Sequence, residues 1–337
     1  MTSPLSSPPG PRVGIDENGL GPRLGPLIVT AVLADANEAG ARQLKRKLPS
    51  SLAKDLDDSK VLVSNKNASL GEAWARAVVE RTLGKTPRTP RQLLNLLLLE
   101  KEGSLKKDCP PSTIKQCWNT ENESFSATSE QLERIHQHLD ELTHRGINVQ
   151  AVLSEVVCNG RLNQLKTDGI HRFQADLHAM ERLILRLRKQ THTPLLATCG
   201  KVGGIGKYEP FFGPLAGRLH IALEEGRAQS CYQFPELGEI RFVRDADASD
   251  PLVMLASLVG KYVRELMMNR ISGFYRQGLN DPSLRPSGYH DPITNKFVER
   301  TKNMRNSLNI VQDCFERRPA EKKPAKKTSK RPIKKKG

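Results

Sequence analysis

The sequence predicts an α/β fold in which a mixed central β-sheet is flanked by helices, followed by a helical C-terminal region. Short apolar runs rich in β-branched residues, such as 27–33 and 149–157, are typical of buried strands. Between such runs, residues 168–190 carry apolar side chains three and four positions apart, which predicts an amphipathic helix. Strands that alternate with helices along one chain favour a single sheet covered by helices.

The remaining elements follow from the same patterns. Asp176 and His178 fall off the apolar face of the 168–190 helix, so we expect both on a solvated surface. Residues 103–129 are polar and include Pro110 and Pro111, which predicts a loop within an insertion at 86–130. Further strands are expected at 12–19, 194–198 and 239–243, and further helices at 64–83, 91–101, 130–144, 251–268 and 295–316.

Composition divides the 337 residues into three parts. Residues 1–11 are rich in Ser and Pro and are expected to be disordered, whereas 12–316 should form the globular domain. Residues 317–337 hold eleven Lys or Arg and one acid, so +10 of the net charge of +16 lies in this tail. Such a disordered tail attracts nucleic-acid phosphates, although a tail that serves only solubility or localisation is the alternative.

No apolar run is long enough to span a membrane, and the N-terminus lacks a signal-peptide pattern. We therefore expect a cytoplasmic protein, and we expect it to be a monomer. The six cysteines form no C-x-x-C pair and have no zinc-finger spacing, so they are expected to be reduced thiols.

The sharpest local feature is the segment 14–22, in which Asp16 and Glu17 end an apolar strand. Neighbours in a strand point to opposite faces, but a strand end or a bulge would let both acids reach one cation. Carboxylates are the ligands that Mg²⁺ and Mn²⁺ prefer, and Gly19 and Gly21 let the backbone approach a ligand. A strand-end turn with solvated acids is the alternative.

Three further motifs follow in order. Asp58-Ser59-Lys60 forms a polar turn, and Asp247 lies at a strand-to-helix junction in the segment 246–251. Asp250 in that junction is expected to cap the following helix. Near the C-terminus, Ser287-Gly288-Tyr289 places an aromatic ring in a glycine turn, where the ring could stack on a sugar or a base.

Taken together and in this order, the four motifs resemble those of the ribonuclease HII family. That family combines GIDE-x-G-x-GP, DSK, an Ala-Asp-Ala before a helix with Lys-x-x-Arg, and Gly-Tyr, and this chain supplies each of them. The resemblance covers about residues 12 to 315, interrupted by the 86–130 insertion. It implies a ribonuclease H-like fold and hydrolysis of RNA hybridised to DNA or of ribonucleotides embedded in DNA.

The resemblance also implies roles for particular residues. Asp16, Glu17 and Asp247 fall on three of the four acids with which the family binds two Mg²⁺ or Mn²⁺ ions. The backbone of Gly19, Leu20 and Gly21 corresponds to the segment that recognises the ribose 2′-hydroxyl, and Tyr289 to a ring that packs on the deoxyribose. The alternative role for Tyr289 is that its ring only closes the C-terminal turn. Lys60 and Lys261 would contact phosphates or form local ion pairs.

The chain departs from the family pattern at two positions. The fourth acid is replaced by Gly200, or by Cys199 if the register slips by one, and Leu20 replaces an Arg. Asp245 and Asp250 could compensate if the segment around Asp247 is extended. The implied function is thus a metal-dependent endoribonuclease, with a catalytically impaired nucleic-acid-binding protein as the alternative. A different ribonuclease H-like enzyme is a third reading, against which the DSK and SGY motifs argue.

Overall fold

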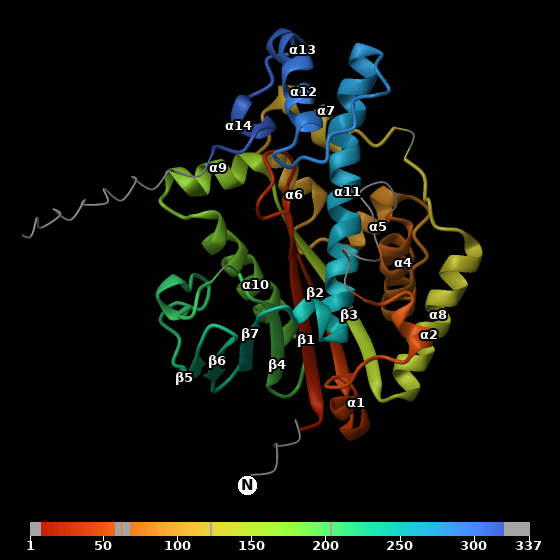
Figure 1. The fold of residues 1–337 in the computed structure, drawn as a ribbon, viewed down its shortest axis with the longest axis vertical. Helices are drawn as coiled ribbons and strands as arrows, with labels where there is room; N and C mark the ends of the chain where they lie inside the picture. Colours follow the sequence, from red (N-terminus) through yellow and green to blue (C-terminus); the bar gives the residue numbers. More distant parts are fainter. Residues whose placement is uncertain (1–7, 58–61, 63–67, 122, 203, 320–337) are drawn as a thin grey trace, which may run out of the picture.

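The centre of the molecule is a seven-stranded mixed sheet with the strand order β3-β2-β1-β4-β7-β6-β5 (Figure 1). The computed structural model describes residues 8–57, 62, 68–121, 123–202 and 204–319. Strand β1 is parallel to β4, and β4 to β7, while the other neighbours are antiparallel. This mixed sheet confirms the predicted fold class. The strands are β1 (Gly10–Asn18), β2 (Leu27–Ala36), β3 (Ile147–Val157), β4 (Leu195–Gly200), β5 (Ile221–Glu225), β6 (Gln229–Phe234) and β7 (Gly238–Val243).

Helices cover both faces of the sheet, and a helical group lies at the upper end of α11 in Figure 1. The first half of the chain contributes α1 (Glu38–Gln43), α2 (Ser50–Ala53), α4 (Ser69–Leu83), α5 (Pro90–Leu97), α6 (Glu102–Lys107), α7 (Pro111–Trp118) and α8 (Ser129–His144). The second half contributes α9 (Asn159–Thr167), α10 (Arg172–Arg188), α11 (Pro251–Leu279), α12 (Pro292–Arg300), α13 (Lys302–Ser307) and α14 (Gln312–Phe315), with short 3₁₀ turns η1 (Glu209–Phe211) and η2 (Ala246–Ala248).

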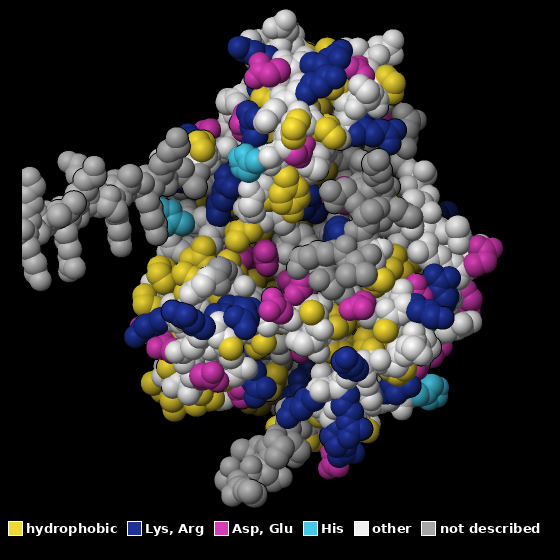
Figure 2. Space-filling model, in the orientation of Figure 1, with side chains coloured by type: hydrophobic (Ala, Val, Ile, Leu, Met, Phe, Trp, Pro, Cys, Tyr) yellow, Lys and Arg dark blue, Asp and Glu magenta, His cyan; other side chains and the backbone are white. Residues whose placement is uncertain are grey.

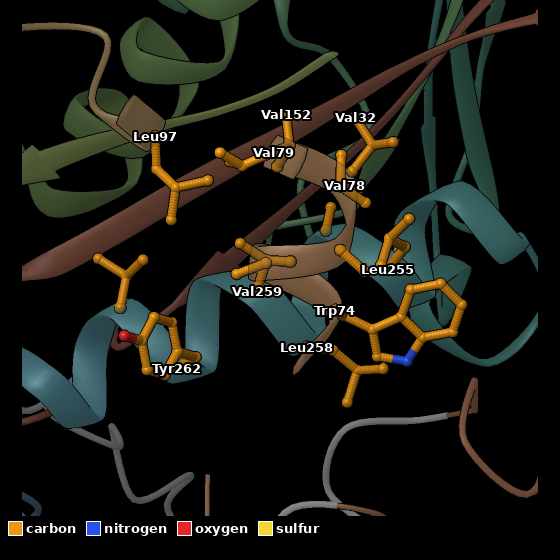
Figure 3. Close-up of a cluster of buried hydrophobic side chains, with 14 of the residues drawn as sticks. Val32, Trp74, Val78, Val79, Leu97, Val152, Leu255, Leu258, Val259 and Tyr262 are labelled. Carbon is orange, nitrogen blue, oxygen red and sulfur yellow. The ribbon is translucent and has the colours of Figure 1, made fainter. Parts of the chain in front are cut away.

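Strand β1 lies between the two cores because its side chains alternate between faces. Val13 and Ile15 belong to the apolar cluster formed with α10. Gly14 faces α11, where a side chain would overlap the backbone of Leu252. The cluster on the α11 face includes Trp74 and residues of α4 and α11 (Figure 3). The same alternation sends Asp16 toward α11 and Glu17 toward α10.

Two of the predicted elements are wrong. Residues 103–129 were expected to form a loop, but they contain α6 and α7, and α7 starts with Pro111 in its first turn. Pro is compatible with that position because the first N–H groups of a helix have no partner within it. The predicted helix 295–316 is broken into α12, α13 and α14. Asn309, which follows α13, adopts a left-handed backbone conformation and separates α13 from α14.

Element ends also differ from the sequence predictions. Strand β1 starts at Gly10, inside the segment expected to be disordered, and α11 continues to Leu279 instead of ending near 268. Helix α4 starts at Ser69, not at 64, and residues 63–67 lie outside the described part. Among the described residues, no helix is long and apolar enough to cross a membrane.

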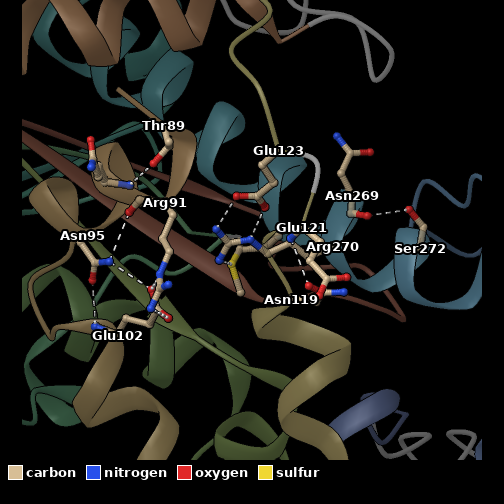
Figure 4. Close-up of polar contacts among 12 residues, drawn as sticks. Thr89, Arg91, Asn95, Glu102, Asn119, Glu121, Glu123, Asn269, Arg270 and Ser272 are labelled. Carbon is tan, nitrogen blue, oxygen red and sulfur yellow. Dashed lines mark hydrogen bonds and ion pairs between the residues drawn. The ribbon is translucent and has the colours of Figure 1, made fainter. Parts of the chain in front are cut away.

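The insertion at 86–130 is fastened to the body by buried charges (Figure 4). Within the insertion, the almost fully buried Glu102 accepts hydrogen bonds from Arg91 and Asn95. On α11, the buried Arg270 donates to both carboxylate oxygens of Glu123, at 2.5 and 3.0 Å. Bidentate pairs of this kind fix geometry as well as contribute energy, so the insertion is held in a defined place on α11.

We predict that Gly14→Ala destabilises the protein by at least about 2 kcal/mol, because the added methyl group would push α11 away from β1. Gly103→Ala is the matched control, since a Cβ at Gly103 in α6 meets no atom within 4 Å. The control should change stability by less than about 1 kcal/mol. Urea unfolding monitored by circular dichroism measures both, and equal midpoints for the two variants would contradict the prediction.

Candidate active site

A pocket of about 740 Å³ opens at the C-terminal end of β1. Figure 2 shows acidic side chains gathered near the centre of this face, where Figure 1 places the end of β1 beside α11. The pocket brings together most of the residues that the sequence predicted for the site, although they are far apart in the chain. Its lining includes Asp16, Glu17, Gly19, Leu20, Gly21, Gly200, Asp247, Lys261 and Tyr289.

Asp16 is the most buried of the pocket's acids, with 7% of its surface exposed. Burial raises the pKa of Asp16 well above its usual value, and the charges of Glu17 and Asp247 raise it further. A hydrogen bond with Ser257 on α11 acts in the opposite direction. Glu17 and Asp247 therefore both lie within electrostatic range of Asp16. A cation bound among these carboxylates would relieve their repulsion.

Asp247 enters the pocket from η2, the turn between β7 and α11. The segment is not extended, as one of the sequence readings required, because Asp245 adopts a left-handed conformation and starts a 3₁₀ turn. Asp245 lies at the rim, where it is exposed and 3.6 Å from Arg244. The predicted capping role of Asp250 is confirmed, since its side chain accepts hydrogen bonds from Leu252 N and Val253 N.

Of the two positions that the resemblance implies for a fourth acid, only Gly200 lies beside the acids of the pocket. A Cβ placed on Gly200 would lie 3.0 Å from Asp16 Oδ1 and 3.9 Å from Glu17 Oε2. Cys199 instead faces α10 and belongs to the buried cluster on that side. A side chain at position 200 would thus enter the group of acids, and the glycine leaves this corner without a carboxylate.

Asp176 contradicts the sequence prediction of a solvated surface residue. Its side chain is fully buried on α10, and neither carboxylate oxygen has a hydrogen-bond partner among the described residues. Burial raises the pKa of Asp176 well above its usual value, with further contributions from Glu17 and Asp16. It does not line the pocket, so it lies behind Glu17 on the α10 face. A buried carboxylate without a partner is costly, and this one is placed beside the site.

The predicted surface position of His178 is also wrong. Its ring is half-buried, and its Nε2 lies 3.0 Å from the carbonyl oxygen of Phe211. Burial is the main reason that the pKa of His178 is lowered. This histidine therefore fastens the turn at η1 to α10 and does not enter the pocket.

The glycine segment 19–25 is held in place by Arg317. The guanidinium of Arg317 donates to the carbonyl oxygens of Gly19 at 2.7 Å, Leu20 at 3.1 Å and Gly25 at 2.5 and 2.9 Å. Arg317 is 2% exposed, so it belongs to the folded body and not to the tail in which the sequence placed it. The tail residues 320–337 lie outside the described part.

The SGY turn is fastened to the same segment. The carbonyl oxygen of Gly288 accepts hydrogen bonds from Arg23 N and Leu24 N, at 2.8 and 2.9 Å. Tyr289 follows and leaves 44% of its surface exposed at the pocket. The guanidinium carbon of Arg264 lies 5.1 Å from the centre of its ring. One face of the Tyr289 ring thus contacts the guanidinium group of Arg264, and the exposed part of the ring can stack on a ligand.

Three of the predicted contact residues differ in where the structure places them. Leu20 packs its side chain against the apolar cluster on the α10 face, although the residue also lines the pocket. Lys60, with the rest of the DSK motif, lies outside the described residues. Lys261 lines the pocket beside the acids.

Sequence reasoning missed several residues of the site. Asp176 was hidden because a polar residue off an apolar helix face usually faces solvent. Arg317 was hidden in a run of basic residues. The pocket lining also includes Lys201, Arg244 and Arg264. Of these, only Arg264 could have been identified from the sequence, because it is the last residue of the Lys-x-x-Arg motif.

The acidic side chains of the pocket are of the type that a hard divalent cation prefers as ligands, because they are carboxylates. Glu17 and Asp247 both raise the pKa of Asp16. In the part of the chain that the structure describes, however, no group of three or more His, Cys, Asp or Glu side chains is arranged to hold a metal ion. The acids share one pocket without converging on one point, and Gly200 is where a further ligand would have to enter.

We predict that Arg317→Met lowers the free energy of unfolding by at least about 2 kcal/mol, because buried carbonyl groups lose a charged donor. The neighbouring Arg318 forms an exposed ion pair with Asp313, so Arg318→Ala should leave the unfolding midpoint close to that of wild type. Chemical denaturation of both variants checks this. An Arg317→Met protein as stable as wild type would show that the glycine segment does not depend on this residue.

No family model matches the sequence, and no curated protein matches it. Among solved structures, ribonuclease HIII of "Bst" with Mn²⁺ is 12% identical, with 93% of this chain and 67% of that chain covered and a TM-score of 0.43. Ribonuclease HII in its complex with PCNA from Archaeoglobus fulgidus is 16% identical, with 93% and 98% covered and a TM-score of 0.41. Ribonuclease H2 from Pyrococcus horikoshii OT3 is 12% identical, with 90% and 92% covered and a TM-score of 0.36. These are distant overall likenesses of the chain to ribonucleases H.

Proposed function

We propose that this protein is a metal-dependent endoribonuclease that hydrolyses the RNA strand of RNA–DNA hybrids or single ribonucleotides embedded in DNA. One observation carries the proposal. A single pocket gathers Asp16, Glu17 and Asp247 together with the glycine segment, Lys261 and Tyr289. Each of these residues belongs to one of the motifs that resemble ribonuclease HII, although Asp16 and Tyr289 are 273 positions apart in the sequence.

The acids would hold Mg²⁺ or Mn²⁺. When bound, such ions supply a hydroxide nucleophile and stabilise charge on the attacked phosphate and the leaving 3′-oxygen. Asp16 is fixed by burial and by Ser257, so its carboxylate is oriented before any ion arrives. Asp247 lies on a turn that the cap of α11 holds in place.

The other side of the pocket fits the nucleic acid. Amides and carbonyls of Gly19, Leu20 and Gly21 can contact a ribose hydroxyl at close range, since glycines present no side chain. Lys261 is placed to meet a phosphate. Tyr289 offers an exposed ring for a sugar, and the basic tail adds sequence-independent attraction.

Asp176 is proposed as a partial replacement for the acid that Gly200 lacks. It lies behind Glu17 on α10, where Glu17 and Asp16 are the charged groups that raise its pKa most after burial. A divalent cation in the pocket would favour the ionised form of Asp176, and that carboxylate would then add to the negative potential that holds the cation. Asp176 is therefore a positioning and charge-supplying residue that acts through Glu17, and not a catalytic residue.

A second function is favoured by one specific observation. The acids do not form a metal-holding group within the described residues, and Gly200 leaves one corner open. A protein with these features would bind hybrids and fail to turn them over. The two functions share the fold and the pocket, so only turnover separates them.

We predict that the wild-type protein cleaves a DNA duplex containing one ribonucleotide when Mn²⁺ is present. Asp16→Asn should lower the rate by at least about 100-fold, because it removes charge from the most buried acid. Gel analysis of a labelled duplex measures the rate, and Glu38→Gln is the control because Glu38 is an exposed acid on α1, near Arg42 and outside the pocket. Salt-sensitive binding without cleavage, in a folded sample, would favour the impaired protein instead.

We predict that Asp176→Asn weakens Mn²⁺ binding by about 10-fold or more, and that Gly200→Asp strengthens it. In the Gly200→Asp background, Asp176→Asn should have a smaller effect, since the added acid supplies the missing charge. Calorimetric titration of the protein with Mn²⁺ alone gives these affinities without any activity measurement. If Asp176→Asn binds Mn²⁺ as tightly as wild type in both backgrounds, Asp176 has no role at the site.

A further inference from the structure

The pocket around Asp16 and Asp247, here called the acidic pocket, is bordered by a row of basic side chains. We call it the basic row and define it by Lys201, Arg244 and Arg227. Lys201 follows β4, Arg244 follows β7, and Arg227 lies in the turn between β5 and β6. Lys201 and Arg244 line the acidic pocket, whereas Arg227 lies outside its lining. The row therefore starts at the site and leads away from it toward β6.

Backbone hydrogen bonds place the basic row on adjacent strands. Lys201 N donates to Val243 O at 2.9 Å, and Arg244 N donates to Ala228 O at 2.9 Å. The ends of β4 and β7 and the start of β6 thus lie side by side at one edge of the sheet. Neighbouring strands are about 4.8 Å apart, so the row spans about 10 Å. One strand of a duplex advances about 3.4 Å per nucleotide, so the row matches about three phosphates.

The ammonium group of Lys201 is held by neutral oxygens. Its Nζ donates to Gly226 O and to Ser230 Oγ, both at 2.8 Å. An ammonium group has three donors, so one remains for a ligand. Glu224 is the acid that acts on Lys201, and its own carboxylate accepts a hydrogen bond from Gln229 Nε2 at 3.0 Å. Lys201 forms no ion pair with any residue that the structure describes, so its charge is available to a phosphate.

The two arginines of the row are open to a ligand as well. Arg227 is exposed and has no ion-pair partner in the described part of the chain. Arg244 leaves 67% of its side chain exposed and lies 3.6 Å from an oxygen of Asp245, whose side chain is 81% exposed. An ion pair as exposed as this one contributes little to stability. A phosphate can therefore bind either guanidinium group without breaking a buried contact.

The acids of the pocket lie between two groups of cations. Figure 2 shows Lys and Arg side chains beside the acidic side chains at the centre of this face, on the side where Figure 1 places β6 and β7. On the other side, Lys261 and Arg264 of α11 line the same pocket. A polyanionic strand that crosses the acids is repelled by them. Cations on both sides, which bind the flanking phosphates, offset that repulsion.

The side chains of the basic row fit phosphates and not bases. Lys and Arg donate to phosphate oxygens, and the guanidinium group of Arg can donate two parallel hydrogen bonds to one phosphate. The exposed aromatic ring of the pocket, Tyr289, lies on the other side, against Arg264. Contacts with phosphates carry no sequence information. The row therefore fits the backbone of a nucleic-acid strand of any sequence.

We propose that the basic row binds the phosphates of the nucleic-acid strand on one side of the cleaved position. The inference rests on the proposed function, because it places the cleaved phosphate at the acids. The strand leaves the acidic pocket past Lys201 and Arg244 and crosses the β5–β6 turn at Arg227. The row thereby sets the direction of the strand through the site and extends the contact by about three nucleotides.

The test measures how the full chain binds a labelled DNA duplex with one ribonucleotide, without divalent ions, over a range of KCl concentrations. Fluorescence anisotropy gives the affinity. Arg227→Met and Arg244→Met should each weaken binding and reduce the slope of log K against log salt by about 1, because each removes one phosphate contact. Arg42→Met is the matched control, since Arg42 is an exposed arginine on α1 outside the pocket. Its salt slope should equal that of wild type.

Lys201 needs a second variant, because its hydrogen bonds also hold the β5–β6 turn. Lys201→Met should lower the salt slope as the arginine variants do, whereas Lys201→Arg keeps the charge and should restore it. Two shortened duplexes then locate the contact, each ending directly beside the ribonucleotide on one side. With one of them, wild type and the Arg227→Met/Arg244→Met double variant should bind equally, because the phosphates that the row binds are missing.

The proposal is overturned if the arginine variants keep the affinity and salt slope of wild type. It is also overturned if both shortened duplexes still separate the double variant from wild type. Variants that bind as wild type does, in a protein that cleaves the duplex, would remove the basic row and leave the proposed function intact. A wild-type protein that neither binds nor cleaves the duplex would remove both.

Discussion

The close packing of β1 against α11 is the constraint on which the candidate site depends. At Gly14 a side chain would overlap the backbone of Leu252, and at Gly260 it would overlap the side chain of Asn18. The helix therefore lies directly on the strand over about two turns. Only at this short distance can Ser257 of α11 reach Asp16 of β1. The junction before α11, which carries Asp247, is brought to the strand end by the same packing, so one contact between two elements assembles the acids.

Assembly of the acids has an electrostatic cost. Asp16 is nearly buried beside Glu17 and within range of Asp247, and all three would carry the same charge. Asp176 adds a fourth carboxylate from the opposite face, without a hydrogen-bond partner among the described residues. Folding alone gives no reason to collect acids in this way, because replacing them by neutral residues would remove the repulsion. A site that recruits cations gives a reason, since each carboxylate then contributes to binding.

The sequence predicted those parts of the structure that depend on local patterns. The strands at β1, β2 and β3 and the helices α8 and α10 follow from apolar periodicity, and Asp250 follows from capping chemistry. The grouping of Asp16, Glu17, Asp247 and Tyr289 followed from their motifs. Asp176, His178 and Arg317 could not be placed, because their positions are set by packing between distant segments. Helix α7 was missed because Pro110 and Pro111 were read as a loop, although Pro111 starts the helix.

The two pockets are linked through one segment of the chain. The glycine segment that lines the acidic pocket continues into Gly25 and Pro26, which line a second pocket of about 410 Å³ together with residues of α7, α9 and α14. Arg317 binds the carbonyl of Gly25 as well as that of Gly19, and a side chain at Gly25 would overlap Met268 on α11. The segment therefore has little freedom to move by itself. A change in the packing of α7, α9 and α14 around the second pocket would reach the backbone of residues 19–21 through these few hydrogen bonds. The 86–130 insertion would then support the acidic pocket from a distance, through the rigidity of residues 19–26, without contributing a residue to it.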